Sequence, residues 1–192
     1  MKKVMRLALL ALTLLSSFIS EAQLDVKHYV PPVFTRENYG CHYAVLSTPS
    51  ITPFNVTITD GTGTLLNTVS ISAATSVSVP FGCTDTTQFL VTEPELNTIL
   101  TNKGLVLEGP EAFYVNIRAF ADPQATSITS KGRNAALGMD FRSGHLFNNT
   151  GYPTGKSNTI GIMATEDNTT INITDISTGV IFRGTPTTGG TS

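Results

Sequence analysis

The feature that most constrains this fold is a two-residue alternation of apolar and polar side chains, broken at short intervals by glycine and proline. Residues 54–59 read Phe-Asn-Val-Thr-Ile-Thr, and the run 60–63, Asp-Gly-Thr-Gly, follows them. Successive side chains of a β-strand point to opposite faces of its sheet, so this alternation predicts a half-buried strand. Asp-Gly favours a tight turn, because glycine adopts the positive φ angle that such turns require. We therefore predict a hairpin whose return strand covers residues 65–71.

The same pattern predicts strands along much of the chain. Threonine and serine together make up 45 of the 192 residues, and threonine, like valine, suits a pleated surface better than a helix. The further predicted strands cover residues 43–46, 77–79, 105–107, 113–120, 136–141, 159–164, 169–174 and 180–182. Gly109-Pro110 is predicted to form the turn between two of them.

One helix is predicted over residues 92–104. Thr92 and Glu95 have the spacing of a capping box, and Pro94 is tolerated in a first helical turn. A helix of this length needs to dock on a sheet to be stable. The sequence therefore predicts an all-β fold, an antiparallel β-sandwich with one short docked helix.

A propeller-like or tandem β-repeat arrangement is the alternative. Residues 56–60 read Val-Thr-Ile-Thr-Asp and residues 171–175 read Ile-Asn-Ile-Thr-Asp, at an offset of 115 residues. This echo indicates either two similar hairpins or a second repeat that begins near the end of the chain.

The chain begins with the pattern of a secretory signal peptide. Basic residues precede an apolar run at 7–15, and small residues at 20 and 22 suit a signal peptidase, so we predict cleavage after Ala22. The apolar run is too short to span a membrane, and no later segment is long enough either. The predicted organisation is a signal peptide at 1–22, an irregular N-terminal segment at 23–40, a β-rich module at 41–156, further β-hairpins or the start of a second repeat at 157–184, and a polar tail or linker at 185–192.

Export makes the two cysteines informative. Cys41 and Cys83 form an even pair in an oxidising compartment, and we predict a disulfide between them. Two buried free thiols, or pairing outside the chain, are the alternatives. A zinc site does not fit, because the cysteines are far apart and lack the paired spacing of a zinc cluster.

Charge argues against nucleic acid as a partner. The chain has 12 Lys and Arg against 14 Asp and Glu, a formal charge of −2, and charged residues make up only 14% of it. Nucleic-acid-binding domains instead concentrate basic residues on one face. We predict no nucleic-acid partner, no membrane span and no cofactor.

Two groups of residues are candidate binding sites. Lys131, Arg133 and Arg142 lie in a polar segment that we place on loops, and they could dock an anionic glycan or an acidic neighbouring module; a solvated loop is the alternative. Weak Ca²⁺ candidates are the acidic residues at predicted turns, where carboxylates more commonly bond to the local backbone. These candidates are Asp60, Glu166, Asp167 and Asp175.

The sequence predicts no enzyme. Asp140, Ser143 and His145 have the residue types of a catalytic triad, but in an extended segment Ser143 and His145 would lie about 7 Å apart. Carboxylates that could form a glycosidase pair have no spacing that fixes their geometry. They are Glu93, Glu95, Glu108 and Glu111.

Three segments carry a family resemblance: 163–173 (Met-Ala-Thr-Glu-Asp-Asn-Thr-Thr-Ile-Asn-Ile), 129–132 (Thr-Ser-Lys-Gly) and 138–142 (Gly-Met-Asp-Phe-Arg). With them, residues 43–183 resemble the N-terminal domain family of IgGFc-binding proteins. The chain looks most like the secreted members from Bacteroidetes, which are often long surface proteins with a C-terminal sorting domain. The resemblance implies an extracellular all-β binding or adhesion module without catalytic residues, and we expect further domains in a longer parent chain.

The combined prediction is a secreted or cell-surface recognition module that binds extracellular glycan or glycoprotein. Exposed threonine, serine, asparagine and aromatic side chains would do the binding. Two alternatives stay open: a structural stalk module of a larger surface protein, and an accessory domain of a secreted hydrolase.

Overall fold

A computed structural model describes residues 23–34, 41–83, 87–121, 124–144, 159–177, 181–182 and 185–186. Within these ranges the regular structure is mostly strand, and the one α-helix there is a single short turn. The all-β prediction is confirmed. The signal peptide predicted over 1–22 and its cleavage point lie outside the described residues.

Most of the strands are short. In chain order the elements are β1 (Asp25–Val30), β2 (Val33–Phe34), β3 (His42–Ser47), β4 (Phe54–Asp60), β5 (Leu65–Ile71), β6 (Val77–Gly82), β7 (Leu90–Val91), the 3₁₀ turn η1 (Glu93–Glu95), β8 (Leu105–Ala121), β9 (Gln124–Thr129), α2 (Arg133–Ala136), β10 (Ile181–Phe182) and β11 (Thr185–Pro186). Among them, β2 and β7 pair in parallel as a separate two-stranded ribbon, and β10 pairs with β11.

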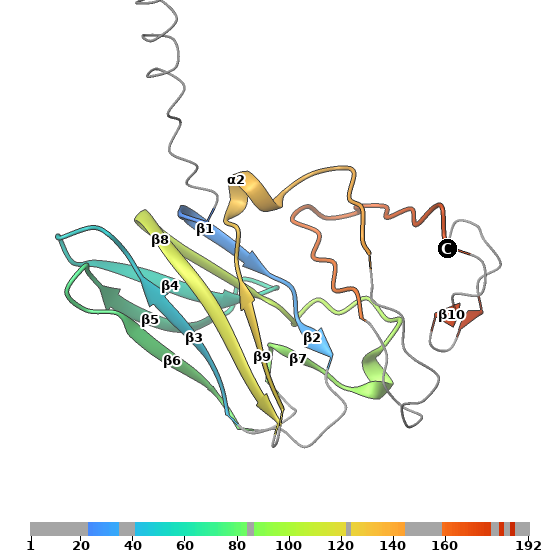
Figure 1. The fold of residues 1–192 in the computed structure, drawn as a ribbon, viewed down its shortest axis with the longest axis horizontal. Coiled ribbons are helices and arrows are strands. Elements are labelled where there is room, and N and C mark those ends of the chain that lie inside the picture. The colour runs from blue at the N-terminus through green and yellow to red at the C-terminus, as the bar shows by residue number, and fades with distance from the viewer. Residues whose placement is uncertain are drawn as a thin grey trace, which may run out of the picture.

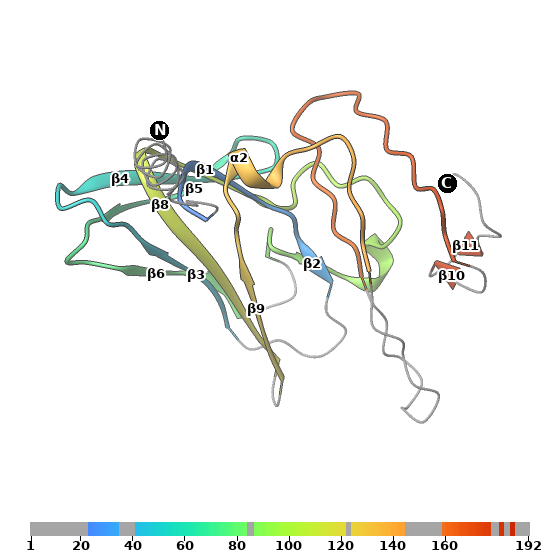
Figure 2. The ribbon, with the colours of Figure 1, turned by 45° about the horizontal axis from the view of Figure 1, so that its top comes forward.

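The long strand β8 organises one antiparallel seven-stranded sheet. Its path runs β5-β4-β8-β3-β6, and β1 and β9 also pair with β8. The first part of β8 pairs with β1 and β4, and the second part pairs with β3 and β9. The sheet is curled, so that its two halves face one core (Figures 1 and 2). The sandwich is therefore a single sheet folded on itself through a shared strand.

An irregularity in β8 marks the boundary between the two halves. Lys27 of β1 pairs with Glu108 and Asp25 pairs with Phe113, so β8 has extra residues between these two pairs. This bulge contains Gly109 and Pro110, and proline suits a place where the ladder is interrupted because it has no N–H to donate. The predicted Gly-Pro turn is wrong, because the strand continues across it.

Alternation along β8 places its apolar side chains in the core. Leu105 and Leu107 are buried in the first half, and Phe113 and Ile117 are buried in the second. Both halves of the sheet contribute to one apolar cluster, and the rings of Phe54 and Phe113 meet edge-on with 6.4 Å between their centroids. One continuous core explains why the two halves form one folded unit.

The predicted hairpin at residues 54–71 is present as β4 and β5. The carboxylate of Asp60 accepts hydrogen bonds from the backbone N–H groups of Thr62 and Thr64, at 2.8 and 3.0 Å, and from the Thr62 hydroxyl. Gly63 has φ +85°, the left-handed conformation that favours glycine. Local turn chemistry therefore closes this hairpin.

The N-terminal segment, predicted to be irregular, contributes β1 to the main sheet. Buried His28 fixes its position: the ring Nδ1 lies 2.8 Å from Ser130 Oγ, just after β9, and Nε2 lies 2.8 Å from the carbonyl oxygen of Phe113. Asp25 accepts a hydrogen bond from the backbone N–H of Asn134 at 2.8 Å, which holds the first turn of α2 against β1. The start of β1 thus joins β9 and α2.

The predicted helix at 92–104 is reduced to η1. The Glu95 carboxylate accepts hydrogen bonds from the backbone N–H and the hydroxyl of Thr92, so the capping interaction exists. Leu96 is already extended, with ψ 145°, and Asn97 has a positive φ of 59°, which ends the helical geometry after one turn. Lys103 packs back instead, with its amine 2.8 Å from the carbonyl oxygen of Leu90.

Strand predictions in the last third of the chain are mostly wrong. Where a strand was predicted over 136–141, the structure has the end of α2 followed by irregular chain. Residues 159–177 contain no assigned strand, so the echo between 56–60 and 171–175 joins a strand to an irregular segment. Alternation alone did not form strands here, because no neighbouring strand pairs with these residues in the described structure.

Candidate functional site

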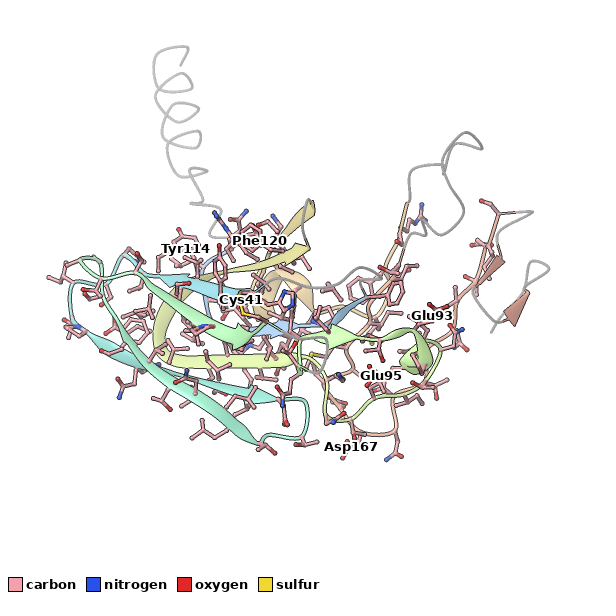
Figure 3. The ribbon with its side chains drawn as sticks, turned by 90° about the horizontal axis from the view of Figure 1, so that it is seen from below. Cys41, Glu93, Glu95, Tyr114, Phe120 and Asp167 are labelled. Carbon is pink, nitrogen blue, oxygen red and sulfur yellow. A yellow bond between two sulfur atoms is a disulfide. The ribbon has the colours of Figure 1, made fainter. Side chains whose placement is uncertain are left out.

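The outward side of the second half of the sheet carries exposed aromatic side chains beside polar ones. We call it the β8 face and define it by the outward residues of β3, β6, β8 and β9. They are Tyr43, Val45, Ser47, Ser78, Pro80, Tyr114, Asn116, Arg118, Phe120, Ser127 and Thr129. Tyr114 and Phe120 are 41% and 39% exposed, and they lie on the same side of the sheet (Figure 3).

Strand register brings the aromatic residues of this face together. Tyr43 of β3 lies directly opposite Arg118 of β8, and the rings of Tyr43 and Phe120 stack with centroids 5.7 Å apart. Tyr114 is four residues before Arg118 on the same strand, a separation of about 13 Å. The β8 face therefore has a stacked aromatic pair toward one end and a single tyrosine toward the other.

A hydrogen-bond network connects the polar side chains between these aromatics. Asn116 Nδ2 donates to Thr129 Oγ1 at 2.9 Å. The Asn116 side-chain oxygen Oδ1 accepts from Ser127 Oγ at 3.1 Å and from Arg118 Nε at 3.3 Å. Because Asn116 uses both ends of its amide, it holds the guanidinium of Arg118 in a defined orientation on the face.

The predicted disulfide is confirmed and lies at one end of the β8 face. Cys41 is bonded to Cys83 across 42 positions of sequence. Cys41 immediately precedes β3 and Cys83 immediately follows β6, and these two strands are antiparallel neighbours. His42 pairs with Ala119, so the disulfide lies beside the strand end that carries Phe120 (Figure 3). It cross-links the chain where the stacked aromatic pair is placed.

The predicted basic residues are distributed over α2 and the chain on either side of it. Lys131 is exposed just before α2, and Arg133 is the first residue of that helix rather than part of a loop. The charge of Arg133 acts on the buried Asp25 carboxylate, and Arg142 lies on the irregular chain beyond α2.

The acidic turn residues are also dispersed. Asp60 lies in the β4–β5 turn, whereas Glu166, Asp167 and Asp175 are exposed on the C-terminal segment. Burial raises the pKa of Asp60, but the hydrogen bonds from Thr62 and Thr64 outweigh it and bring this pKa below its ordinary value. Among the described residues, no group of three or more His, Cys, Asp or Glu side chains is placed to hold a metal ion.

The carboxylates considered for glycoside cleavage lie on two separate elements. Glu93 and Glu95 belong to η1, and Figure 3 shows them apart from Tyr114 and Phe120. Glu108, on β8, forms an ion pair with Lys27 at 2.8 Å. In the candidate triad, Asp140 and Ser143 are on irregular chain after α2, and His145 lies outside the described residues.

Two histidines are buried in the sheet and differ in their surroundings. Burial lowers the pKa of His28, although its hydrogen bonds to backbone carbonyls oppose this effect. Burial also lowers the pKa of His42. Both rings are therefore biased toward the neutral form, as parts of the fold.

Comparisons with family models, with curated proteins and with solved structures found nothing that matches this chain. Among the described residues, no helix combines the length and hydropathy that crossing a membrane would require. The chemistry of the β8 face is therefore the basis for proposing a function.

Sequence reasoning missed this face for a specific reason. Tyr114, Asn116, Arg118 and Phe120 appear in the sequence only as the outward half of an alternating strand. Their partners Tyr43, Ser127 and Thr129 come from other strands, and only the pairing register shows which residues they meet. The available signal was the density of aromatic, amide and guanidinium groups on one side of residues 113–120.

Proposed function

We propose that this protein is a secreted or cell-surface recognition module that binds extracellular carbohydrate on the β8 face without cleaving it. The observation that supports the proposal most directly is the placement of the exposed rings of Tyr114 and Phe120 around the Asn116 network on one rigid sheet. The Cys41–Cys83 disulfide agrees with an oxidising, extracellular setting.

The chemistry of the face matches the chemistry of a sugar. A pyranose ring presents C–H groups on its flat sides and hydroxyl groups around its rim. Aromatic rings offer large, rigid apolar surface at low entropic cost, and the amide, hydroxyl and guanidinium groups between them supply donors and acceptors for the rim. Because the strands fix these groups, little ordering is required when a glycan binds.

The family resemblance implies the same class of function. An extracellular all-β adhesion module of the type found at the N-terminus of IgGFc-binding proteins would use exposed sheet surface for recognition. Immunoglobulin itself is not part of our proposal. A glycan or the glycan part of a glycoprotein is the ligand class that suits the β8 face.

The test is a glycan array probed with the purified chain, followed by titration calorimetry on the best ligand. We expect Phe120→Ala and Tyr114→Ala each to weaken binding about tenfold, equivalent to about 1.4 kcal/mol. Phe141→Ala is the matched control, because Phe141 is 68% exposed and lies on irregular chain rather than on a strand of the β8 face. It is expected to leave affinity unchanged.

Three results would overturn the proposal: no glycan bound at any concentration tested, equal loss of affinity in the Phe141→Ala control, or release of shortened sugars from the bound ligand. The proposal would also be contradicted if the chain bound a glycoprotein only after the glycans of that glycoprotein had been removed. Circular dichroism of each variant checks that the fold is retained.

A further inference from the structure

We infer that the carbohydrate recognised on the β8 face is acidic, a glycan whose sugar rings carry a carboxylate that binds to Arg118. This inference deepens the proposed function and depends on it. Its basis is the charge and the unused hydrogen-bonding capacity of one side chain.

Arg118 is the one charged residue among the described residues that define the β8 face. The ion pairs found among the described residues are Lys27 with Glu108 and Lys103 with Glu95, and neither involves Arg118. An exposed guanidinium without a carboxylate partner leaves a local positive charge on an otherwise uncharged surface.

The contacts of Arg118 leave its binding end unused. Its Nε donates to Asn116 at 3.3 Å, which orients the planar group, while the two terminal nitrogens make no hydrogen bond to the described residues. A guanidinium presents its N–H groups in a fork that matches the two oxygens of a carboxylate. The network thus holds Arg118 ready to bind a planar anion.

Neighbouring side chains indicate that the anion belongs to a sugar. Tyr43 is the direct cross-strand neighbour of Arg118, and its ring stacks with that of Phe120. A ring carboxylate bound at Arg118 would bring its own pyranose ring within reach of this aromatic pair. A free inorganic anion would use the guanidinium alone and leave the aromatic residues without a role.

Polygalacturonate and its fully methyl-esterified form provide a matched pair of probes, because they share one backbone and differ only in the ring carboxylate. We expect the purified chain to bind the acid form at least about tenfold more tightly. Raising the salt concentration to about 0.5 M should weaken binding of the acid form and leave the ester unaffected. A polysaccharide whose only charged groups are sulfates tests whether any anion is sufficient. If the chain binds it as tightly as the acid form, the assignment to a carboxylate is overturned.

Variants locate the effect. Arg118→Gln should remove the preference for the acid form. Arg118→Lys should retain only part of this preference, because lysine keeps the charge without the fork of N–H groups. Lys27→Gln removes the same charge from β1, where Lys27 forms an ion pair with Glu108, so it should change affinity by less than about twofold.

The outcomes separate the two proposals. Equal binding of the acid and ester forms, with both lost in Phe120→Ala, would overturn the acidic ligand and leave carbohydrate recognition intact. A preference for the acid form that survives Arg118→Gln would overturn the role of Arg118. Failure to bind the acid form, the ester or any neutral glycan would overturn both proposals.

Discussion

His28 Nδ1 lies 2.8 Å from Ser130 Oγ, although 102 residues separate them along the chain. His28 Nε2 lies 2.8 Å from the carbonyl oxygen of Phe113, which can only accept, so Nε2 carries the proton. Nδ1 therefore accepts the proton of the Ser130 hydroxyl. This contact ties β1 to the end of β9 inside the fold.

Ser130→Ala should lower the free energy of unfolding by about 1–3 kcal/mol, because it leaves a buried ring nitrogen without its donor. Urea unfolding monitored by circular dichroism gives the midpoint and the slope. Ser78→Ala, on the exposed side of β6, is the matched control and should change stability by no more than about 0.5 kcal/mol. Equal effects of the two substitutions would contradict a specific role for the His28–Ser130 contact.

Stability should decrease as the solution is acidified from neutral pH. The folded-state pKa values of His28 and His42 lie below the ordinary 6.5, so below that pH the unfolded chain binds more protons than the folded one. Their stabilising effect is complete above 6.5 and is lost as the pH falls through the folded-state values. Urea midpoints measured in steps from about pH 7.5 to about pH 5 should decrease, and a constant midpoint would refute this prediction.

The stability of the fold should decrease again in more acidic solution. Burial raises the pKa of Asp25, but hydrogen bonds from Asn134, Val26 and Lys27 and the charge of Arg133 bring it below the ordinary 3.8. The pKa of Asp60 is also lowered, so both carboxylates stabilise the fold above that pH and stop doing so as the pH falls through their folded-state values. Asp60→Asn should reduce the slope of stability against pH in this acidic range.

Reduction of the Cys41–Cys83 bond should destabilise the protein by about 4 kcal/mol, because the unfolded chain regains the freedom of a long loop. Guanidinium unfolding with and without a reductant measures the difference. The double variant Cys41→Ser/Cys83→Ser should be as unstable as the reduced protein and insensitive to reductant. A reductant effect of the same size in that variant would show that the change does not come from this bond.

Gly63→Ala should destabilise the β4–β5 hairpin by about 1–2 kcal/mol, because alanine is strained at a φ of +85°. No atom lies within 4 Å of the added Cβ at Gly63, so steric contact is not the cause. Gly144→Ala meets equally open space without the positive φ, and it should be neutral. Thermal melts of both variants compare them directly, and equal melting temperatures would contradict the argument.

Local chemistry explains which parts of the fold the sequence could predict. The β4–β5 hairpin depends on Asp60 and on alternation within a few residues, so it is readable without knowing any distant partner. The disulfide was predictable from the signal-peptide pattern and the even number of cysteines. In contrast, the bulge at Gly109 and Pro110 looks like a turn until the register of β1 against β8 is known.

The residues of the candidate site likewise depend on partners that are distant in the sequence. Lys131, Arg133 and Arg142 are grouped in the sequence because they lie in one polar segment, and the structure places Arg133 on α2 and Arg142 on the irregular chain after it. Tyr43 and Phe120 are 77 positions apart and meet only through the pairing of β3 with β8. A surface built from several strands depends on the pairing register of those strands, which cannot be read directly from the sequence.

Strand β8 also has a mechanical consequence. Because it belongs to both halves of the sheet, the two layers are joined by covalent backbone as well as by their shared core. Separating the two layers therefore requires breaking the hydrogen-bond ladders on β8 as well as opening the shared core. A load carried by β8 is thus shared among the hydrogen bonds of several strand pairs.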